Sequence, residues 1–319
     1  MNFSKSSIRK KRREITAKKG KITKKLTTML YELALLSVFA LIITVGCAGY
    51  GAYQGILAAS PSIKDIDATP TGYLSTILDS EGNTTATLVA SGSNRVYVTI
   101  DEIPKNLQNA FIAIEDARFR EHNGIDVKGI IRAGVNGIAA GFRFREGAST
   151  ITQQLLKNNV FTSWTAEKSQ ADRFKRKIQE QYLALQLEKE ESKDWILENY
   201  LNTVNLGQNT LGVQSASKRY FGKDVSELSL SECAVIAGIT KNPSGYNPIT
   251  HPEANEKRRK KVLDDMKDQG LITNKQYKKA LKDPVYSRIQ KVNARQLDKS
   301  SVHSYFDDAL TEQVIEDLM

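Results

Sequence analysis

One stretch of the chain combines a carboxylate, an aromatic ring and an imidazole at helical spacing. Glu115, Phe119 and His122 lie at positions i, i+4 and i+7, so a helix running on from Pro104 would carry all three on one stripe. A carboxylate held against apolar neighbours has its neutral form favoured by desolvation, which makes it a usable proton acceptor near neutral pH. Glu115 is therefore the first candidate for a catalytic base.

The same stretch also has a plainer interpretation. Glu-Asp pairs on helices are usually solvated, so Glu115 and Asp116 also fit a surface position beside a packed histidine. Gly124 marks the end of the predicted helix, and Asp126 is suited to cap the helix that follows. The rest of the chain must decide between the catalytic and the structural interpretation.

A second stretch predicts a helix start that binds an anion. Gly147 permits a tight entry, and Ser149 or Thr150 can cap a helix whose first turn presents free N–H groups. Amide and ammonium side chains follow along one side of this helix: Gln153, Gln154, Lys157 and Asn158. A phosphate or pyrophosphate is the natural guest of such a site. A capped surface helix explains the same residues without any ligand.

A long helix predicted over residues 172–190 carries the third cluster. Glu180 lies one turn beyond Arg176 and Lys177 on this helix. The usual meaning of such a group is a solvated ion pair, which contributes little to stability. A carboxylate beside two cations is also what a pyrophosphate needs when it is held directly or through a metal ion.

The elements that carry these clusters are predicted to be mainly helical. Helical periodicity continues from Pro104 to about Gln269, broken by joints rich in Gly or Asn. Ahead of it, β-prone runs at 76–78 and 86–90 flank a turn cluster, and residues 95–100 form a third run. We therefore expect a small β-hairpin region that leads into a helical body.

The piece at 126–144 is apolar but rich in glycine. Glycine at this density weakens a helix, so we expect a mobile segment. Its aliphatic face beside Arg132, Arg143 and Arg145 suits the headgroup boundary of a membrane. An ordinary, loosely packed core helix fits the same residues equally well.

The charge of the chain is concentrated at its N-terminus. Residues 1–26 hold eleven Lys or Arg and a single acid, Glu14, while the rest of the chain has equal numbers of basic and acidic residues. The net charge of +10 therefore belongs to a tail and does not indicate a nucleic-acid-binding domain.

An uncharged stretch follows this tail. No residue from Leu33 to Ile63 is charged, and the stretch is long enough to span a bilayer, which needs about 20 residues. The basic block ahead of it predicts a cytoplasmic tail and an extracellular body, in a single-pass protein of the cell membrane. A cleaved signal peptide would have a shorter apolar region, and Thr44 disfavours a lipoprotein signal ending at Cys47. Cys47 and Cys233 are expected to be packing residues.

Taken together, these segments resemble the peptidoglycan glycosyltransferase domain of class A penicillin-binding proteins and their monofunctional relatives, the family 51 glycosyltransferases. The resemblance covers about residues 70–270 in the family's order. Its motifs are Glu115-Asp116-x-x-Phe119-x-x-His122-x-Gly124-x-Asp126, Gly147-x-Ser149-Thr150-x-x-Gln153-Gln154, Arg176-Lys177-x-x-Glu180, Ile196-Leu197-Glu198-x-Tyr200-Leu201-Asn202, and Ala216-x-x-x-Tyr220-Phe221-Gly222 with a return to Arg258-Arg259. The chain departs from the family at Asp172, where many members carry an Arg; here Arg173 is adjacent.

The resemblance implies a lysozyme-like helical domain and an order of segments. We expect a basic cytoplasmic tail at 1–28, a transmembrane anchor at 29–59, a linker and small β region at 60–103, the glycosyltransferase domain at 104–270 and a helical connector toward a missing transpeptidase domain at 271–319. No transpeptidase motif is found, because Ser7-x-x-Lys10 lies in the tail and no Lys-Thr-Gly follows.

The resemblance also implies a reaction. Lipid II and a growing glycan strand would be joined by a β-1,4 linkage, with inversion and release of undecaprenyl pyrophosphate. Glu115 would act as general base, and Glu180 would assist the leaving group through Mg²⁺ or Mn²⁺. The implied substrate-binding residues are Asp116, Phe119, His122, Ser149, Thr150, Gln153, Gln154, Lys157, Asn158, Arg176, Lys177 and Asn202. The implied partners are the cytoplasmic membrane and other cell-wall synthesis proteins.

Two other functions stay open at this point. A lysozyme-like enzyme that cleaves peptidoglycan would use Glu115 as general acid and would need no pyrophosphate site. A non-catalytic anchored scaffold would bind cell-wall partners, and its function would not depend on Glu115.

Overall fold

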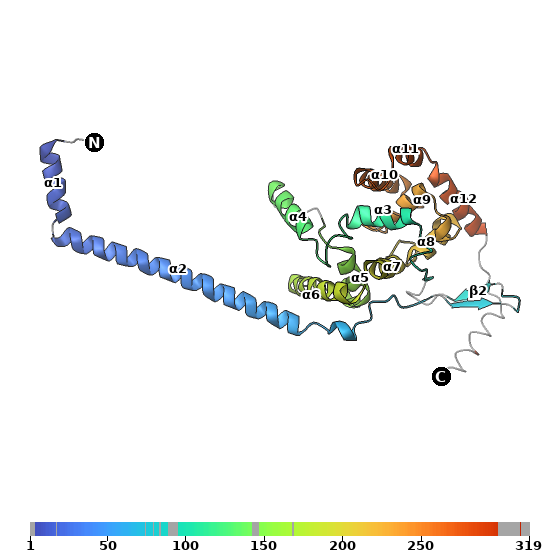
Figure 1. Ribbon diagram of the computed structural model, residues 1–319, viewed down its shortest axis with the longest axis horizontal. Coiled ribbons are helices and arrows are strands. Elements are labelled where there is room, and N and C mark those ends of the chain that lie inside the picture. The colour runs from blue at the N-terminus through green and yellow to red at the C-terminus, as the bar shows by residue number, and fades with distance from the viewer. Residues whose placement is uncertain are drawn as a thin grey trace. The chain divides into compact units, whose positions relative to one another are not determined.

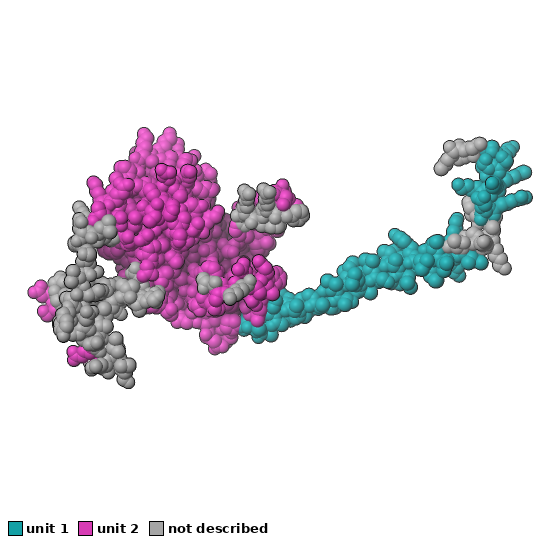
Figure 2. Space-filling model, turned by 180° about the vertical axis from the view of Figure 1, so that it is seen from behind, with its two compact units in different colours: residues 1–60 teal, residues 61–319 magenta. Residues whose placement is uncertain are grey.

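The computed structural model describes residues 4–16, 18–73, 75–78, 80–82, 84–88, 95–141, 147–167, 169–298 and 313. The chain divides into two compact units, residues 1–60 and 61–319, which carry separate colours in Figure 2. The described residues are mainly helical, as the sequence predicts (Figure 1).

The first unit consists of two helices. α1 spans Lys5–Thr16, and α2 runs through Lys18–Ala58. α2 is long and apolar enough to cross a membrane, and none of its most apolar window is buried within the protein. The predicted apolar N-terminal helix is therefore present, and it is consistent with a membrane anchor.

The second unit begins with η1, Ile63–Asp65, and a short antiparallel ladder. β1, Ser75–Leu78, pairs with β2, Thr84–Leu88, with Ser75 opposite Leu88. The third β-prone run is not a strand, which differs from the prediction: of its residues only Arg95 joins a bridge, with Leu211. The Asn202 side chain takes the place of a partner strand there, because it bonds both the N–H and the carbonyl of Val98.

Ten helices and two short 3₁₀ turns form the described body of this unit. Their bounds are α3 Lys105–Glu115, α4 Val127–Ala139, α5 Ile151–Asn159, η2 Thr162–Ala166, α6 Gln170–Glu190, α7 Lys193–Thr203, α8 Val213–Phe221, η3 Val225–Glu227, α9 Leu230–Ile239, α10 Pro252–Asp268, α11 Asn274–Leu281 and α12 Val285–Asp298.

The core is organised around α9. This helix is apolar on all sides and is buried along its length, so it must be surrounded, and α3, α8, α10 and α11 pack against it (Figure 1). The predicted capping box of Ser229 and Glu232 opens the helix. A second layer forms where α5 packs against both α6 and α7. Cys233 lies fully buried in the first layer, as expected of a packing residue.

Residues beyond 270 contribute to the same core. The buried guanidinium of Arg259 donates hydrogen bonds to the Ala280 carbonyl and to the Ser231 hydroxyl, each at 2.8 Å, and so ties the end of α11 to α9. Arg288 of α12 donates to the Glu232 carboxylate at 2.8 Å. The helices that follow residue 270 are thus joined to α9 through hydrogen bonds of two arginines, the buried Arg259 and the partly exposed Arg288.

The predicted helix through residues 104–124 is shorter than expected. α3 ends at Glu115, and Asp116 leaves the helical backbone with a φ of −157°. Phe119 and His122 lie in the turns that follow, so the prediction of one helical stripe with Glu115 is wrong. The physical reason is that the Asp116 carboxylate bonds the first N–H of α5, a long-range contact that the local periodicity does not contain.

Gly124 is required by both its backbone and its surroundings. Its φ is +90°, and a Cβ atom built on it would lie 2.5 Å from the Ala184 carbonyl oxygen. Gly270 has a similar φ of +72° but nothing within 4 Å of its Cβ position. Comparing alanine substitutions at Gly124 and Gly270 therefore separates the strain of a positive φ from the steric clash with α6.

We expect Gly124→Ala to lower the free energy of unfolding by about 3 kcal/mol or more, because strain and overpacking add. Gly270→Ala, with strain alone, should cost about 1 kcal/mol. Chemical unfolding of both variants in detergent measures the difference. Equal losses would contradict the contact with α6.

Candidate active site

Glu115 is held at the end of α3 by donors from two other elements. Gln154 of α5 donates to one carboxylate oxygen at 3.0 Å, and the Thr240 hydroxyl, at the end of α9, donates to the other at 2.6 Å. The side chain is half-buried. Three segments that are distant in sequence therefore fix the direction of this carboxylate.

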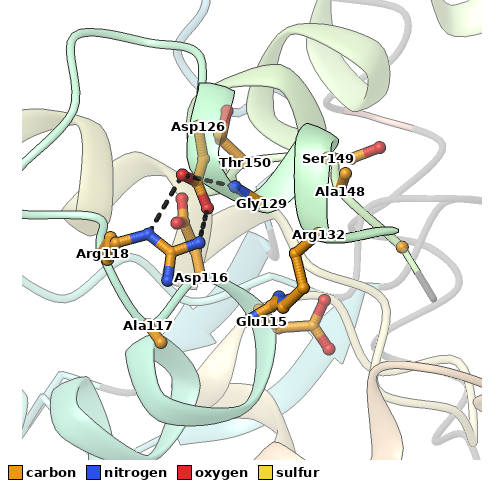
Figure 3. A pocket seen from close by; sticks show the side chains of 11 residues that line it. Glu115, Asp116, Ala117, Arg118, Asp126, Gly129, Arg132, Ala148, Ser149 and Thr150 are labelled. Carbon is orange, nitrogen blue, oxygen red and sulfur yellow. Dashed lines mark hydrogen bonds and ion pairs between the residues drawn. The ribbon is translucent and has the colours of Figure 1, made fainter. Parts of the chain in front are cut away.

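Glu115 faces a cleft of about 730 Å³. Eight predicted site residues line it: Glu115, Asp116, Ser149, Gln153, Gln154, Lys157, Lys177 and Glu180. A smaller pocket of about 30 Å³ also borders Glu115 and Thr150, and Figure 3 shows it with Arg132 of α4 next to Glu115. The described structure thus gathers the central residues of three separate sequence clusters.

One ammonium group in the cleft is surrounded by acceptors. Lys177 donates to the Ser149 hydroxyl at 2.8 Å, to the Gln153 amide oxygen at 3.1 Å and to the Glu180 carboxylate at 2.9 Å. Glu180 itself is almost fully buried and also bonds Arg176. These contacts join the beginning of α5 to the middle of α6 and hold a cation at the cleft wall.

A second ammonium group is more desolvated. Lys157 is half-buried, and its Nζ atom lies 4.3 Å from the centre of the Trp164 ring. Burial lowers the pKa of Lys157; Glu180 opposes this shift, while the cations Lys177 and Arg176 reinforce it. The protein therefore maintains a cation here at an electrostatic cost, which a bound anion would offset.

The beginning of α5 differs from the predicted anion site. Thr150 is the cap and accepts a hydrogen bond from the Gln153 N–H, while the Asp116 carboxylate accepts one from the Ile151 N–H at 2.9 Å. The first and third N–H groups of the helix are therefore already paired, in place of the free N–H groups that the sequence predicted. Near this end of α5, the side chains of Ser149 and Lys177 line the cleft.

Two residues of the first motif support the site from behind. Gly124 donates its N–H to His122 Nδ1, so His122 Nε2 carries the proton and donates to Asp116 at 2.9 Å. Phe119 is fully buried, and the Lys193 ammonium lies 4.5 Å from its ring centre. Phe119 and His122 lie outside the described cleft lining.

The other predicted site residues also lie outside that lining. Asn202 is fully buried and bonds the backbone of Val98 and of Glu198. Asn158 is half-buried on α5, and Arg176 turns toward Glu167. For Asn202 the structure gives a plain architectural role, which is to attach the segment at 95–100 to α7.

Sequence reasoning overlooked one wall of the cleft. It is formed by α10, the end of α9 and part of α4, through Arg132, Thr240, Lys241, Arg258, Lys261, Asp265 and Gln269. Arg258 stood in the last segment of the family resemblance, and Arg132 in the glycine-rich piece, but neither was assigned to the site. Thr240 had no motif, because only the approach of α9 to α3 brings its hydroxyl to Glu115.

Glu180 is the side chain that the sequence assigned to a metal ion. Mg²⁺ takes oxygen ligands, often one or two carboxylates together with substrate phosphates. In the cleft, one Glu180 oxygen is bonded to Arg176 and the other to Lys177. Among the described residues no group of three acidic, His or Cys side chains could hold a metal ion. This arrangement does not fit a preformed metal site.

Comparison with known proteins identifies the family. Residues 81–267 match the family described as transglycosylase, more than half of the chain. The chain therefore belongs to the transglycosylase family and carries its enzyme domain. The predicted membership among peptidoglycan glycosyltransferase domains of the penicillin-binding type is confirmed.

Several relatives are larger proteins. The chain is 36% identical over 307 residues to penicillin-binding protein 1A of Clostridium botulinum, covering 94% of this chain and 36% of that protein. It is 39% identical over 302 residues to penicillin-binding protein 1A/1B of Bacillus subtilis, covering 94% and 31%. The chain thus spans about a third of the length of these relatives.

A crystal structure of penicillin-binding protein 1A from Haemophilus influenzae is also similar to the chain. The match has a TM-score of 0.37 and 25% sequence identity, and it covers 69% of this chain and 21% of that one.

Proposed function

We propose that the protein polymerises lipid II into β-1,4-linked glycan strands with release of undecaprenyl pyrophosphate. The observation that carries this proposal is a single cleft with a fixed carboxylate, Glu115, and two cations, Lys157 and Lys177. A general base and a cationic site for a leaving anion are the two requirements of this transfer. Membership of the transglycosylase family supports the same conclusion.

In the proposed reaction Glu115 accepts the proton of the 4-hydroxyl group of the acceptor sugar. The freed oxygen attacks the anomeric carbon of the donor, and the bond from that carbon to the phosphate oxygen breaks, so the configuration inverts. Gln154 and Thr240 hold the carboxylate through both oxygens and limit its rotation. Such preorganisation reduces the entropy that must be lost in the transition state.

The leaving pyrophosphate gains negative charge as the bond breaks. Lys157 and Lys177 would stabilise this charge directly, and the Ser149 hydroxyl, which accepts a hydrogen bond from Lys177, would turn to the phosphate. Glu180 would act by orienting Lys177 and Arg176. A bridging Mg²⁺ or Mn²⁺ at Glu180 would first have to displace these cations, so no step of the proposal passes through a metal.

A peptidoglycan-cleaving enzyme is less well supported. A glycosidase pairs its general acid with a second carboxylate across the sugar ring. Of the other acidic residues that line the cleft, Asp116 is bonded to His122 and Asp265 to Lys261, while Glu180 is bonded to Arg176 and Lys177. Hydrolysis of a glycosidic bond releases no pyrophosphate, so Lys157 and Lys177 would have no anionic leaving group to stabilise.

We expect Glu115→Gln to slow polymerisation of labelled lipid II by a factor of at least about 100, because the base is lost. Glu180→Gln should slow it by about 10-fold or more, because its cations lose their orientation. The control is Glu121→Gln, an exposed carboxylate in the turn after α3, with an unchanged rate.

The assay uses the purified protein in detergent, with and without Mg²⁺, and thermal melting checks each fold. Full activity of Glu115→Gln would contradict the proposal that Glu115 is the general base. Release of fragments from isolated cell wall, without polymer, would indicate the lytic alternative, and inactivity in both assays would indicate the scaffold. If polymer formation is lost when Mg²⁺ is removed, the result would support a metal ion bound at Glu180.

The lowered pKa of Lys157 gives a pH prediction. Because burial disfavours its charged form, Lys157 loses its proton at a lower pH than an exposed lysine, and leaving-group stabilisation is lost as pH rises through that pKa. Lys157→Arg stays charged, so the alkaline fall in polymerisation rate should move to higher pH. The exposed Lys260→Arg is the control, and an alkaline limb that does not move in Lys157→Arg would contradict the assignment.

The setting of this reaction is proposed to be the outer face of the cytoplasmic membrane. α2 would anchor the chain, with the basic tail in the cytoplasm. α4 exposes Val127, Ile131, Val135 and Ile138 on its surface, each about 60% accessible. We propose that this aliphatic face contacts lipid, which suits substrates that are themselves lipids.

To test α4, Ile131→Cys is labelled with an environment-sensitive fluorophore in a Cys47→Ser protein and reconstituted into liposomes. We expect a blue-shifted emission and quenching by brominated lipids, because the face enters the lipid boundary. Lys260→Cys, on the exposed side of α10, should show neither change. Equal spectra at both positions would contradict the contact.

A further inference from the structure

Arg176 is the one cation of the third motif that does not line the described cleft. Its guanidinium is bonded on both sides by carboxylates. Nε donates to Glu167 at 2.7 Å, and Nη1 donates to Glu180. The charge of Arg176 is therefore balanced within the protein by one carboxylate that lines the cleft, Glu180, and by one outside the described lining, Glu167.

Glu167 lies directly after η2. Its backbone carbonyl accepts a hydrogen bond from Arg173 at 3.3 Å, so the residue is attached to the first turns of α6. Its side chain is only 16% exposed, and the second carboxylate oxygen, Oε2, is buried without a partner among the described residues. A half-paired buried carboxylate of this kind is costly, and losing Arg176 would leave its charge without a partner, so the Glu167 side chain holds Arg176 firmly.

Glu167 changes the net charge of the group of side chains around Glu180. Arg176 and Lys177 are balanced by two carboxylates, Glu180 and Glu167, which leaves Lys157 as the unbalanced cation of this group. Without the Glu167 charge, the cluster would carry one more positive charge close to the cleft. A diphosphate would then be held more tightly, and a tightly held product leaves slowly.

We infer that Glu167 is a counter-charge that holds Arg176 away from the cleft and weakens the binding of a diphosphate group. It acts through Arg176 and is therefore a positioning residue that sets affinity for the leaving group. The inference rests on the proposed function, because it assumes that the cations of this cleft bind a diphosphate.

A purely structural role for Glu167 makes a different prediction. Gln keeps the length of the side chain but holds a guanidinium less firmly than a carboxylate does, so Glu167→Gln frees Arg176. The Arg173 bond to the backbone carbonyl of residue 167 does not use this side chain, so the link between η2 and α6 is retained. If Glu167 only fastens this loop, the substitution should leave diphosphate affinity unchanged. If it is a counter-charge, affinity should rise while thermal melting stays the same.

The test measures binding of inorganic pyrophosphate to the full chain in detergent by titration calorimetry, in buffer without divalent metal. We expect Glu167→Gln to bind pyrophosphate about fivefold more tightly than the unaltered protein. Asp172→Asn is the matched control, because it removes an exposed acid from the first turn of the same helix. Its affinity should change by less than about twofold, since solvent screens exposed charges.

A second pair of variants isolates the route through Arg176. In an Arg176→Met background, Glu167→Gln should no longer increase affinity, because the cation that it releases is absent. An increase that persists there, an equal increase in Asp172→Asn, or unchanged or undetectable pyrophosphate binding in Glu167→Gln would each overturn the inference.

Lipid II polymerisation by the same preparations separates this result from the proposed function. Polymer formation with no effect of Glu167→Gln on pyrophosphate affinity would remove only the inference. Absence of polymer would remove the proposed function, whatever the pyrophosphate result.

Discussion

The buried carboxylate of Asp116 is the contact on which the site depends. It accepts hydrogen bonds from the first N–H of α5 and from His122, and so joins the end of α3 to the beginning of α5. Glu115 is the preceding residue, and Gln154 lies in the first turn of α5. One buried group therefore positions both the proposed base and its donor. Removing either partner would leave the buried carboxylate only partly paired, and this cost resists independent motion of the two helices.

The electrostatics of the cleft follow from the packing of α5 against α6. Lys157 comes from α5, and Lys177 and Glu180 come from α6, so the cation group exists only when these helices are in contact. Partial burial strengthens each interaction and also raises the cost of each unpaired charge. Lys177 avoids this cost through its ion pair with Glu180. Lys157 instead lies against the ring of Trp164, which stabilises its charge only in part.

Residues of the same motif have two different roles: some line the cleft, and others hold the fold together. From the first motif, Glu115 faces the cleft, while Phe119 and His122 pack behind it. From the fourth, Asn202 attaches an extended segment to α7 and lies away from the described lining. Proximity in sequence to a reacting group therefore does not indicate contact with substrate. A short polar side chain beside a buried helix end is often used to satisfy backbone groups.

Local chemistry determined much of this protein from sequence alone. The apolar N-terminal helix, the cap at Ser229, a cap at Ser149 or Thr150, and the choice of Glu115 as candidate base follow from composition and short-range spacing, which act within a few residues. Only the tertiary structure showed that α3 ends at Glu115, that Arg176 bonds Glu167 and that the Thr240 hydroxyl reaches Glu115. These outcomes depend on contacts between residues far apart in the chain, and periodicity along one helix carries no information about them.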